Sequence, residues 1–344
     1  MFANKKVSYL GVDIGSSGVR LVELMSVNGV PELVTYGFAE YPLSHVTQGN
    51  LTVSQKEISA TIREVMKRAN VRTNRAYSAL PTDGVFSSII NIPELKKKEE
   101  RSDAIIKEAE KLLPLPVDQM TLDPQTMEKS HVKGLEQILL VAAPKTMVQQ
   151  YLDIFKGAGV ELLGLETESF ALTRSLVGRD QASMAIIDCG ATTTDIIVVA
   201  DGVPQLSRSI GVGGHQVTLA YAKHLGVDSD AAEQMKRDVG LHSAGRGELP
   251  AIAVETVAPI VSEIRYTLDL YSSRSGRSVE KLILTGGSSL LSGLSEHLAV
   301  VAKTRVYIGD PWARVRYPLE LQGVLQSVAP SFSVAIGAAL QPLK

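Results

Sequence analysis

Two stretches of this sequence repeat one pattern, and that pattern decides the fold that we expect. The first is Gly11-Val-Asp13-Ile-Gly15-Ser-Ser-Gly18-Val-Arg20. The second is Ile186-Ile-Asp188-Cys-Gly190-Ala-Thr-Thr-Thr-Asp195, which aligns with the first without a gap, 175 residues further on. Each copy holds an apolar strand, an aspartate, a glycine, small residues that include hydroxylic ones, and a second apolar strand. Because internal similarity of this kind reflects duplicated architecture, we expect two related half-domains, each with such a hairpin.

The tip of each hairpin has the composition of a phosphate-binding turn. Glycine lacks a Cβ and permits positive φ, and successive backbone N–H groups in such a turn form a concave site for phosphate oxygens. A carboxylate beside a polyphosphate requires a cation, so Asp13 and Asp188 each imply Mg²⁺, usually held through water. An aspartate can also cap its own turn, but the pairing favours a site. One nucleotide clamped between two half-domains is the expected result.

Two glycine pairs follow the second hairpin along the chain. Gly213 and Gly214 should let the backbone pass close to phosphates or ribose, with His215 beside them as a polar neighbour rather than a base. Residues 281–291 read as a strand that runs into a Gly-Gly turn and then a helix. That geometry lets backbone lie flat against a base or a ribose.

Length and composition exclude few functions. The chain has 344 residues, enough for two or more domains, and its 44% hydrophobic and 21% charged content is typical of a globular protein. A formal charge of −2 gives no reason to expect nucleic-acid binding. We expect neither a secretory signal nor a membrane-spanning helix. The single cysteine, Cys189, cannot form an intramolecular disulfide, which fits a reducing cytoplasm; we interpret it as a small buried hydrophobic residue.

The region between the hairpins reads as an inserted α/β unit. Ser54 and Glu57 form a capping box ahead of an apolar helical face, and Pro114-Leu-Pro116 ends the next helix. The unit contains no clustered titratable residues with catalytic spacing, so we predict that it binds a partner peptide and performs no chemistry. Strands are predicted at 33–41, 76–80, 85–92 and 137–143, and helices at about 54–69, 97–113 and 146–158.

The order and spacing of the two hairpins and the later glycine turn resemble the actin-like ATPase superfamily. That resemblance implies an α/β fold, namely an actin-like (ribonuclease H-like) duplicated nucleotide-binding fold with an inserted small α/β domain. The first half is expected to comprise residues 1–35, 161–181 and 327–344. The inserted partner-binding domain is expected at 36–160, and the second half, with an adenosine-binding subdomain, at 182–326. The implied cofactors are ATP and Mg²⁺.

Longer stretches carry a narrower resemblance. They are GVDIGSSGVRLVEL (11–24), EAEKLLPLPVDQM (108–120), LLVAAPKTMVQQYLDIFKGAGVEL (139–162), ETESFAL (166–172), IIDCGATTTDIIVVADGVPQLSRSIGVGGHQVT (186–218), EIRYTLDLYSSRSG (263–276) and LILTGGSSLLSGL (282–294). These stretches resemble the PilM family of type IV pilus assembly proteins, which is related to the division protein FtsA. FtsA would be expected to carry an amphipathic membrane helix at its C-terminus, whereas residues 333–344 read as a closing helix with no tail behind it.

The superfamily resemblance implies roles beyond the hairpin tips. Glu168 matches a glutamate near the metal and the attacking water, so it is the candidate for positioning that water if ATP is hydrolysed. Glu166 competes for that role, and a carboxylate at a helix N-terminus can also simply stabilise the dipole. Asp195 matches a second acidic position, which orients water or metal or makes a structural hydrogen bond. Glu233 and Lys236 resemble a ribose-contacting pair on one helical face, or form a surface ion pair.

The expected site therefore draws on both halves of the molecule. Asp13 and Asp188 are the expected outer-shell ligands of the metal, and the two tips supply donors to the phosphates. The later glycine turn forms the adenosine contact. The full set of expected nucleotide contacts is Gly15, Ser16, Ser17, Gly18, Gly190, Ala191, Thr192, Thr193, Asp195, Gly213, Gly214, Glu233, Lys236, Gly286, Gly287 and Ser288.

Two classes of function compete for this sequence. The first is a nucleotide-dependent assembly protein, in which ATP closes the cleft and the closed form holds partner segments. The second is a small-molecule kinase of the same superfamily, which needs a base near a substrate hydroxyl; the sequence offers no obvious candidate. An FtsA-like division protein is a further alternative. ATP binding does not imply turnover, so the chain is at most a slow ATPase.

The PilM resemblance also implies partners and a location. The expected partner is the short cytoplasmic N-terminal tail of a PilN-like inner-membrane protein, bound between the first half and the inserted domain. Contact with pilus motor ATPases is implied as well, and self-association is considered. The chain is expected to be cytoplasmic and to reach the inner membrane only through a partner.

Overall fold

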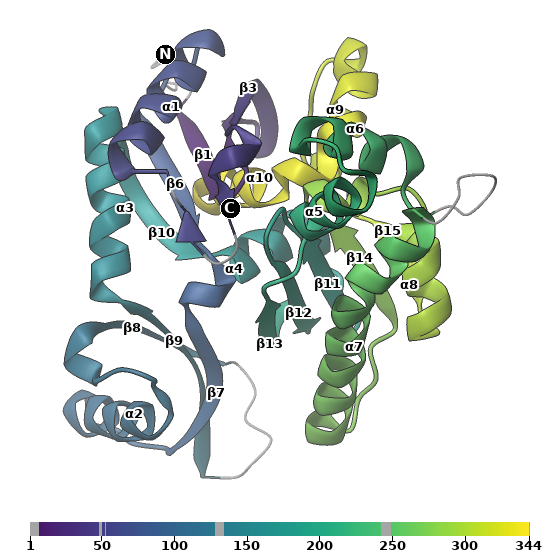
Figure 1. The fold of residues 1–344 in the computed structure, drawn as a ribbon. Coiled ribbons are helices and arrows are strands. Elements are labelled where there is room, and N and C mark those ends of the chain that lie inside the picture. Colours follow the sequence, from purple (N-terminus) through teal and green to yellow (C-terminus); the bar gives the residue numbers. More distant parts are fainter. Residues whose placement is uncertain (1–6, 48–49, 52, 128–133, 242–248, 344) are drawn as a thin grey trace.

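Two five-stranded sheets form the two halves of the molecule, and a separate three-stranded sheet lies beside the first of them (Figure 1). A two-residue pairing of β4 (Val46–Thr47) with β5 (Asn50–Leu51) adds a small hairpin. These features come from a computed structural model, which describes residues 7–47, 50–51, 53–127, 134–241 and 249–343. The first six residues, part of the segment in which we expect no secretory signal, lie outside the described residues.

The first sheet is built around the first hairpin and has the order β10-β6-β1-β2-β3. Strands β1 (Ser8–Gly15), β2 (Gly18–Val27) and β3 (Val30–Glu40) form an antiparallel meander. Strands β6 (Arg75–Leu80) and β10 (Glu161–Thr167) extend the sheet in parallel on the other side of β1.

The second sheet repeats this arrangement in the order β13-β12-β11-β14-β15. Strands β11 (Met184–Cys189), β12 (Thr194–Ala200) and β13 (Val203–Ile210) form the meander. Strands β14 (Lys281–Thr285) and β15 (Arg305–Ile308) continue in parallel. The repeated order of antiparallel and parallel neighbours confirms the duplicated, actin-like fold that the repeated motif predicts.

Helices cover both sheets. In the first half, α1 (Gln55–Arg68) and α3 (Lys145–Ala158) pack together on the sheet, and the capping box predicted for Ser54 and Glu57 starts α1. The short helix α4 (Glu168–Leu172) follows β10. The helices that follow are α5 (Gly214–Leu225), α6 (Ser229–Val239), α7 (Leu249–Ser275), α8 (Leu294–Ala302), α9 (Gln322–Val328) and α10 (Ser333–Leu340).

Single-turn helices and one π-helical turn complete the described elements. Four of them matter below, namely η2, η5, η6 and η8. The turns are η1 (Leu43–His45), η2 (Thr82–Gly84), η3 (Val117–Gln119), η4 (Thr173–Val177), η5 (Gly287–Leu290), η6 (Pro311–Arg314), η7 (Leu319–Leu321), η8 (Ala329–Phe332) and η9 (Gln341–Leu343).

The inserted unit is smaller than the sequence predicts. The three-stranded sheet consists of β7 (Phe86–Pro93), β9 (Leu135–Pro144) and β8 (Met120–Thr126), with α2 (Lys98–Leu112) packed on it. The predicted boundaries of 36–160 are wrong, because the end of β3 (residues 36–40) and all of α1, β6 and α3 belong to the first half. Their apolar side chains share one core with β1, which local sequence patterns do not reveal.

The C-terminal boundary predicted at residue 327 is also wrong. Trp312 and Val315, which follow β15, pack with Val22 and Leu24 of β2 in one buried cluster. The chain therefore returns to the first half at η6, well before α9. The aromatic ring of Trp312 anchors this return, since it is almost fully buried against Phe332.

The expectation that no segment is long and apolar enough to span a membrane needs correction. Residues 319–343 pass that test by length and composition, and 321–343 carry no charged residue. In the fold, however, 67% of the apolar window is buried inside the protein, and every residue of α10 is buried. The segment owes its composition to the core, where α10 packs on β1 and β2.

Two glycines set how closely α10 approaches its neighbours. A Cβ on Gly337 would lie 2.0 Å from the Ala171 carbonyl oxygen of α4, and a Cβ on Gly11 of β1 would lie 1.9 Å from the Ala335 carbonyl oxygen. Both clashes involve backbone, so neither can be relieved by a rotamer change. The helix therefore packs backbone to backbone against both α4 and β1.

We therefore expect Gly337→Ala to destabilise the fold by about 1–3 kcal/mol, the usual cost of overpacking a core. Denaturant unfolding followed by far-UV circular dichroism measures the difference. The matched control is Gly323→Ala, in exposed α9, where a Cβ meets nothing within 4 Å and helix propensity predicts a gain of up to about 1 kcal/mol. A Gly337→Ala protein as stable as wild type would contradict this packing.

Candidate functional site

The first hairpin places its glycines at the closing residues of the turn. Gly15 pairs with Gly18, and Asp13 lies opposite Arg20 two residues back on each strand. Gly18 has φ of +154°, and a Cβ there would lie 2.1 Å from the Ala39 carbonyl oxygen of β3. Glycine is therefore required at Gly18 by the neighbouring strand.

The second hairpin has the same strand pairing as the first, but an aspartate takes the place of the arginine. Asp188 lies opposite Asp195, the position that corresponds to Arg20 in the first copy. The Gly190 N–H donates to the Thr193 carbonyl at 2.9 Å and closes the turn. An aspartate thus lies opposite an arginine in the first hairpin and opposite a second aspartate in the second hairpin.

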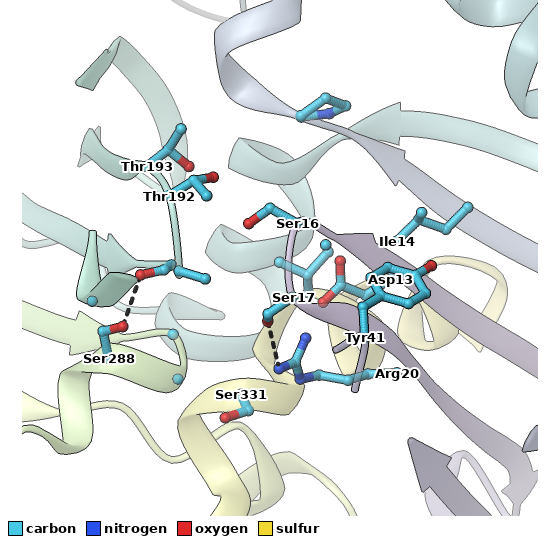
Figure 2. Close-up of a pocket in the computed structure, with 18 of the residues that line it drawn as sticks. Asp13, Ile14, Ser16, Ser17, Arg20, Tyr41, Thr192, Thr193, Ser288 and Ser331 are labelled. Carbon is cyan, nitrogen blue, oxygen red and sulfur yellow. Dashed lines mark hydrogen bonds between the residues drawn. The ribbon is translucent and has the colours of Figure 1, made fainter. Parts of the chain in front are cut away.

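Two segments later in the chain, the start of α5 and η5, hold the second tip in place by hydrogen bonds. The N–H groups of Gly214 and His215, at the start of α5, donate to the carbonyls of Gly190 and Ala191 at 3.1 and 2.8 Å. The Ser288 hydroxyl of η5 donates to the Gly190 carbonyl at 2.8 Å (Figure 2). A Cβ on Gly213 would lie 2.6 Å from the Ala191 carbonyl oxygen. Glycine is thus needed at Gly213 for this contact.

Gly286 lies directly against the second hairpin. Its φ is +83°, and a Cβ would lie 2.3 Å from Asp188 Oδ1 and 2.4 Å from the Cys189 carbonyl oxygen. Only glycine satisfies both constraints. Cys189 itself is buried, and burial raises the pKa of its thiol to about 12, as expected for a residue with a packing role.

The two tips face one cavity of about 870 Å³. In Figure 2, Ser16 and Ser17 lie across from Thr192 and Thr193, with Ser288 and Ser331 on the same side as the glycine turn. Gly18 and Gly213 do not line the cavity. The predicted residues that do line it are Asp13, Gly15, Ser16, Ser17, Glu168, Asp188, Gly190, Ala191, Thr192, Thr193, Asp195, Gly214, Glu233, Lys236, Gly286, Gly287 and Ser288.

Four of the carboxylates that line this cavity have raised pKa values. Burial, opposed by the nearby Arg20, raises the pKa of Asp13 to about 6. Burial and the charges of Asp195 and Asp13 raise the pKa of Asp188 to about 8. Burial raises the pKa of Asp195 to about 7. Burial and the other three carboxylates raise the pKa of Glu168 well above its ordinary value.

This charge distribution fits a cation held through water. The cavity gathers more negative than positive charge, and Asp195 Oδ1 is buried without a hydrogen-bond partner. Among the described residues, no group of three His, Cys, Asp or Glu side chains lies close enough to hold a metal ion directly. Donors this far apart suit a hydrated Mg²⁺, which keeps several of its waters.

The two glutamates near α4 differ in their surroundings. Glu168 lines the cavity, and its Oε2 accepts from the Thr82 N–H at 2.9 Å and the Thr82 hydroxyl at 3.3 Å. Glu166 instead forms a two-point ion pair with Arg174, which also donates to the Gly337 carbonyl. Glu166 is therefore a structural residue in this fold, and Glu168 remains the candidate for the site.

A buried ion pair closes one end of the cavity. Lys236 Nζ donates to Glu233 Oε2 at 2.6 Å, and the same oxygen accepts from the Thr218 hydroxyl at 2.6 Å. Lys236 also donates to the Gly214 carbonyl at 3.2 Å. The pair is only 11–17% exposed at its side chains, so it is not the surface ion pair of the alternative interpretation.

The structure adds cavity residues that were not assigned from the sequence. Arg20 stands beside Asp13 and donates to the Ser17 hydroxyl at 3.4 Å. Its position in the repeat, where the second copy has Asp195, was the available signal. Tyr41 and Ser331 line the cavity from β3's end and from η8; they come from segments whose place only the three-dimensional fold reveals.

A family model and several known proteins match the chain. The model described as type IV pilus assembly protein PilM covers residues 11–343. A solved structure of a PilM-PilN type IV pilus biogenesis complex has a TM-score of 0.86 at 26% identity, and the match covers 98% of this chain and 99% of that chain. MreB5 of Spiroplasma citri bound to AMPPNP has a TM-score of 0.56 at 13% identity over 97% of this chain and 95% of its own. That likeness shows the fold alone.

Curated sequence relatives include the cell division protein FtsA of Rhizobium meliloti. It is 30% identical over 182 residues, which is 46% of this chain. The match spans 40% of the length of that relative.

The raised pKa of Asp188 predicts a pH-dependent stability. The folded protein holds this proton up to about pH 8, whereas the ordinary pKa is 3.8, so stability falls as pH rises between those values. Asp188→Asn mimics the protonated acid. We expect it to be more stable than wild type at pH 8 by at least about 1 kcal/mol, since one pKa unit is worth about 1.4 kcal/mol, and to show no gain at pH 4. Thermal unfolding at both pH values measures this.

Asp180→Asn is the matched control, with the opposite sign. A hydrogen bond from Lys281 at 2.6 Å lowers the pKa of Asp180, so its contribution is present above its ordinary pKa and lost as pH falls through the lowered value. This variant should gain nothing at pH 8. If Asp188→Asn also gains no stability at pH 8, the ionised Asp188 carboxylate does not destabilise the folded protein.

Proposed function

The chain belongs to the PilM family of type IV pilus assembly proteins, and we propose that it binds Mg-ATP in its cleft and a PilN-like tail on its inserted unit. The observation that carries the nucleotide proposal is the opposition of two hairpin tips across one cavity, with hydroxyls on both sides (Figure 2). Backbone N–H groups and hydroxyls on each tip can donate to phosphate oxygens from two sides.

Positive groups of the chain complement this arrangement. Arg20, beside the first tip, supplies a charge-assisted donor for a phosphate oxygen. The Lys236 and Glu233 pair lies at the α5 and η5 end of the cavity, where the ribose and base would lie against Gly286 and Gly287. When bound, Mg²⁺ would offset the negative charge of Asp13 and Asp188 and of the phosphates.

Glu168 is the candidate for orienting a water molecule. Its Oε2 is held by Thr82, and among the described residues no hydrogen bond reaches its Oε1. A carboxylate fixed at one oxygen can accept a hydrogen bond from water at the other. Slow ATP hydrolysis is the most that we assign to this group, because positioning rather than covalent chemistry sets the rate of phosphoryl transfer.

The family supports the partner part of the proposal. A PilN-like inner-membrane protein would bind with its cytoplasmic N-terminal tail between the first half and the inserted unit, whose three-stranded sheet and α2 share a small core of their own. A short extended or helical tail can bind in a groove between two rigid units. The chain would then be cytoplasmic and held at the inner membrane by this partner. Pilus motor ATPases and self-association are further partners proposed from the family alone.

Mg-ATP should stabilise the folded protein by mass action, since it binds the folded state only. At about 100 times Kd the gain should be roughly 2.7 kcal/mol. Thermal unfolding of nucleotide-free protein with and without millimolar Mg-ATP measures it. A melting temperature that Mg-ATP leaves unchanged would contradict the proposal.

Asp13→Ala tests whether this gain arises in the cleft. The loss of an outer-shell carboxylate should weaken Mg-ATP binding at least about tenfold. Asp180→Ala, outside the cavity, should bind like wild type. Equal affinities for Asp13→Ala and Asp180→Ala would place the metal elsewhere.

Deleting the inserted unit should abolish tail binding and spare Mg-ATP binding. Phe86 pairs with Ala142, so the two ends of the unit are adjacent and a short Gly-Ser linker can replace residues 86–143. Calorimetric titration with a synthetic peptide of the PilN-like tail compares the deleted and full-length proteins. Mg-ATP stabilisation of the deletion protein shows that it is folded, and undiminished tail binding would rule out the inserted unit as the docking site.

A further inference from the structure

The inserted unit begins at a turn that touches the cleft. This turn, η2 (Thr82–Gly84), connects β6 of the first sheet with β7 of the three-stranded sheet. Thr82 is buried, and both of its donors bind one carboxylate oxygen, Glu168 Oε2. Among the described residues, the Thr82 N–H and hydroxyl have no other acceptor, and Glu168 has no other donor. In the described part of the chain, the two donors of Thr82 and the carboxylate of Glu168 thus have hydrogen bonds only with each other.

The same turn is confined by both halves of the molecule. A Cβ on Gly84 would lie 2.2 Å from Met147 Cε, so α3 packs directly on the turn. Strand β13, the outer strand of the second sheet, contacts both η2 and β7. Asp83 lines the cavity and, by its charge, raises the pKa of Asp195. A change in the cleft or between the halves therefore acts on this turn.

We infer that η2 transmits the state of the cleft to the inserted unit, with Thr82 as a positioning residue that ties Glu168 to the start of β7. The inference rests on the proposed Mg-ATP site and adds its coupling to the partner-binding unit. When ionised, Asp195, Asp13 and Asp188 oppose a negative charge on Glu168, whose carboxylate Thr82 holds by two hydrogen bonds. A cation-bound ligand offsets that repulsion and draws Glu168 inwards.

The response of Thr82 follows from its bonding. Because a buried N–H left without an acceptor costs about 1–3 kcal/mol, Thr82 moves with Glu168 rather than lose the contact. Strand β7 begins at Phe86, only two residues after the turn, so its pairing with β9 adjusts as well. Linkage is reciprocal, so a partner on the inserted unit alters nucleotide affinity by the same factor.

Hydrogen exchange tests this without the partner. The probe is Mg-AMPPNP at saturation, and the readout is the exchange rate of the β7 and β9 amides in the full-length protein. Wild type should show a change of about fivefold or more, the lower end of typical coupling factors. Thr82→Pro should lose that change while still binding Mg-AMPPNP, which a parallel titration establishes.

Proline is suited to this position. Pro81 has ψ of 142°, as required before a second proline, and the first position of a helix tolerates proline. The substitution removes both donors to Glu168 and no other hydrogen bond that the structure describes for Thr82. Thr82→Ser, which keeps both donors, should behave like wild type. Thr82→Val, which keeps only the N–H, should lose part of the response and decides the question if Thr82→Pro does not fold.

A double-mutant cycle separates the tether from general destabilisation. Glu168→Ala should reduce the β7 response as Thr82→Pro does, and the two together should reduce it no further. Thr121→Val, on an exposed position of β8, is the matched control and should respond like wild type. A full response in Thr82→Pro, or nucleotide binding to wild type without a β7 response, would overturn the inference alone. Failure of wild type to bind Mg-AMPPNP would overturn the proposed function and this inference together.

Discussion

The burial of several carboxylates in one cavity between the two halves is the physical constraint on which the rest of this structure depends. Asp13, Glu168, Asp188 and Asp195 come from both halves, and burial raises the pKa of each of them. The charges of neighbouring carboxylates raise the pKa values of Glu168 and Asp188 further. A cluster of this kind costs folding free energy, which the buried cores of the two halves must offset. Groups with strongly shifted pKa values in a cleft mark functional sites more often than structural ones. The charge that destabilises the empty cleft is what a cation-bound ligand would relieve.

The duplicated sheets explain how the carboxylates come together. Each half builds the same meander and places its aspartate near the end of its first strand, and the halves meet so that both tips face one cavity. The match is not symmetric, because Arg20 in one copy corresponds to Asp195 in the other. One side can thus bind a phosphate oxygen with a cationic side chain, and the other can face a metal. The second tip is further held by α5 and η5.

The sequence predicted the fold and most of the cavity, because those depend on a repeated local motif. The spacing of the motifs indicates the turn glycines, and at Gly18 and Gly286 the close approach of neighbouring atoms leaves no room for a Cβ. Domain boundaries were less predictable, since the apolar face of α1 does not say which sheet it covers, and Trp312 packs on β2 only through the tertiary fold. The partners of Glu166 and Glu168 could not be predicted either, because Arg174 and Thr82 reach them only through helix and turn placement.

A crystal structure of the protein with Mg-AMPPNP tests the central claim most directly. We expect the terminal phosphates to lie between the tip residues 15–18 and 190–193, with a hydrated Mg²⁺ facing Asp13 and Asp188 and the adenosine against Gly286 and Gly287. Nucleotide bound outside this cavity, or phosphates that contact only one of the two hairpins, would contradict it.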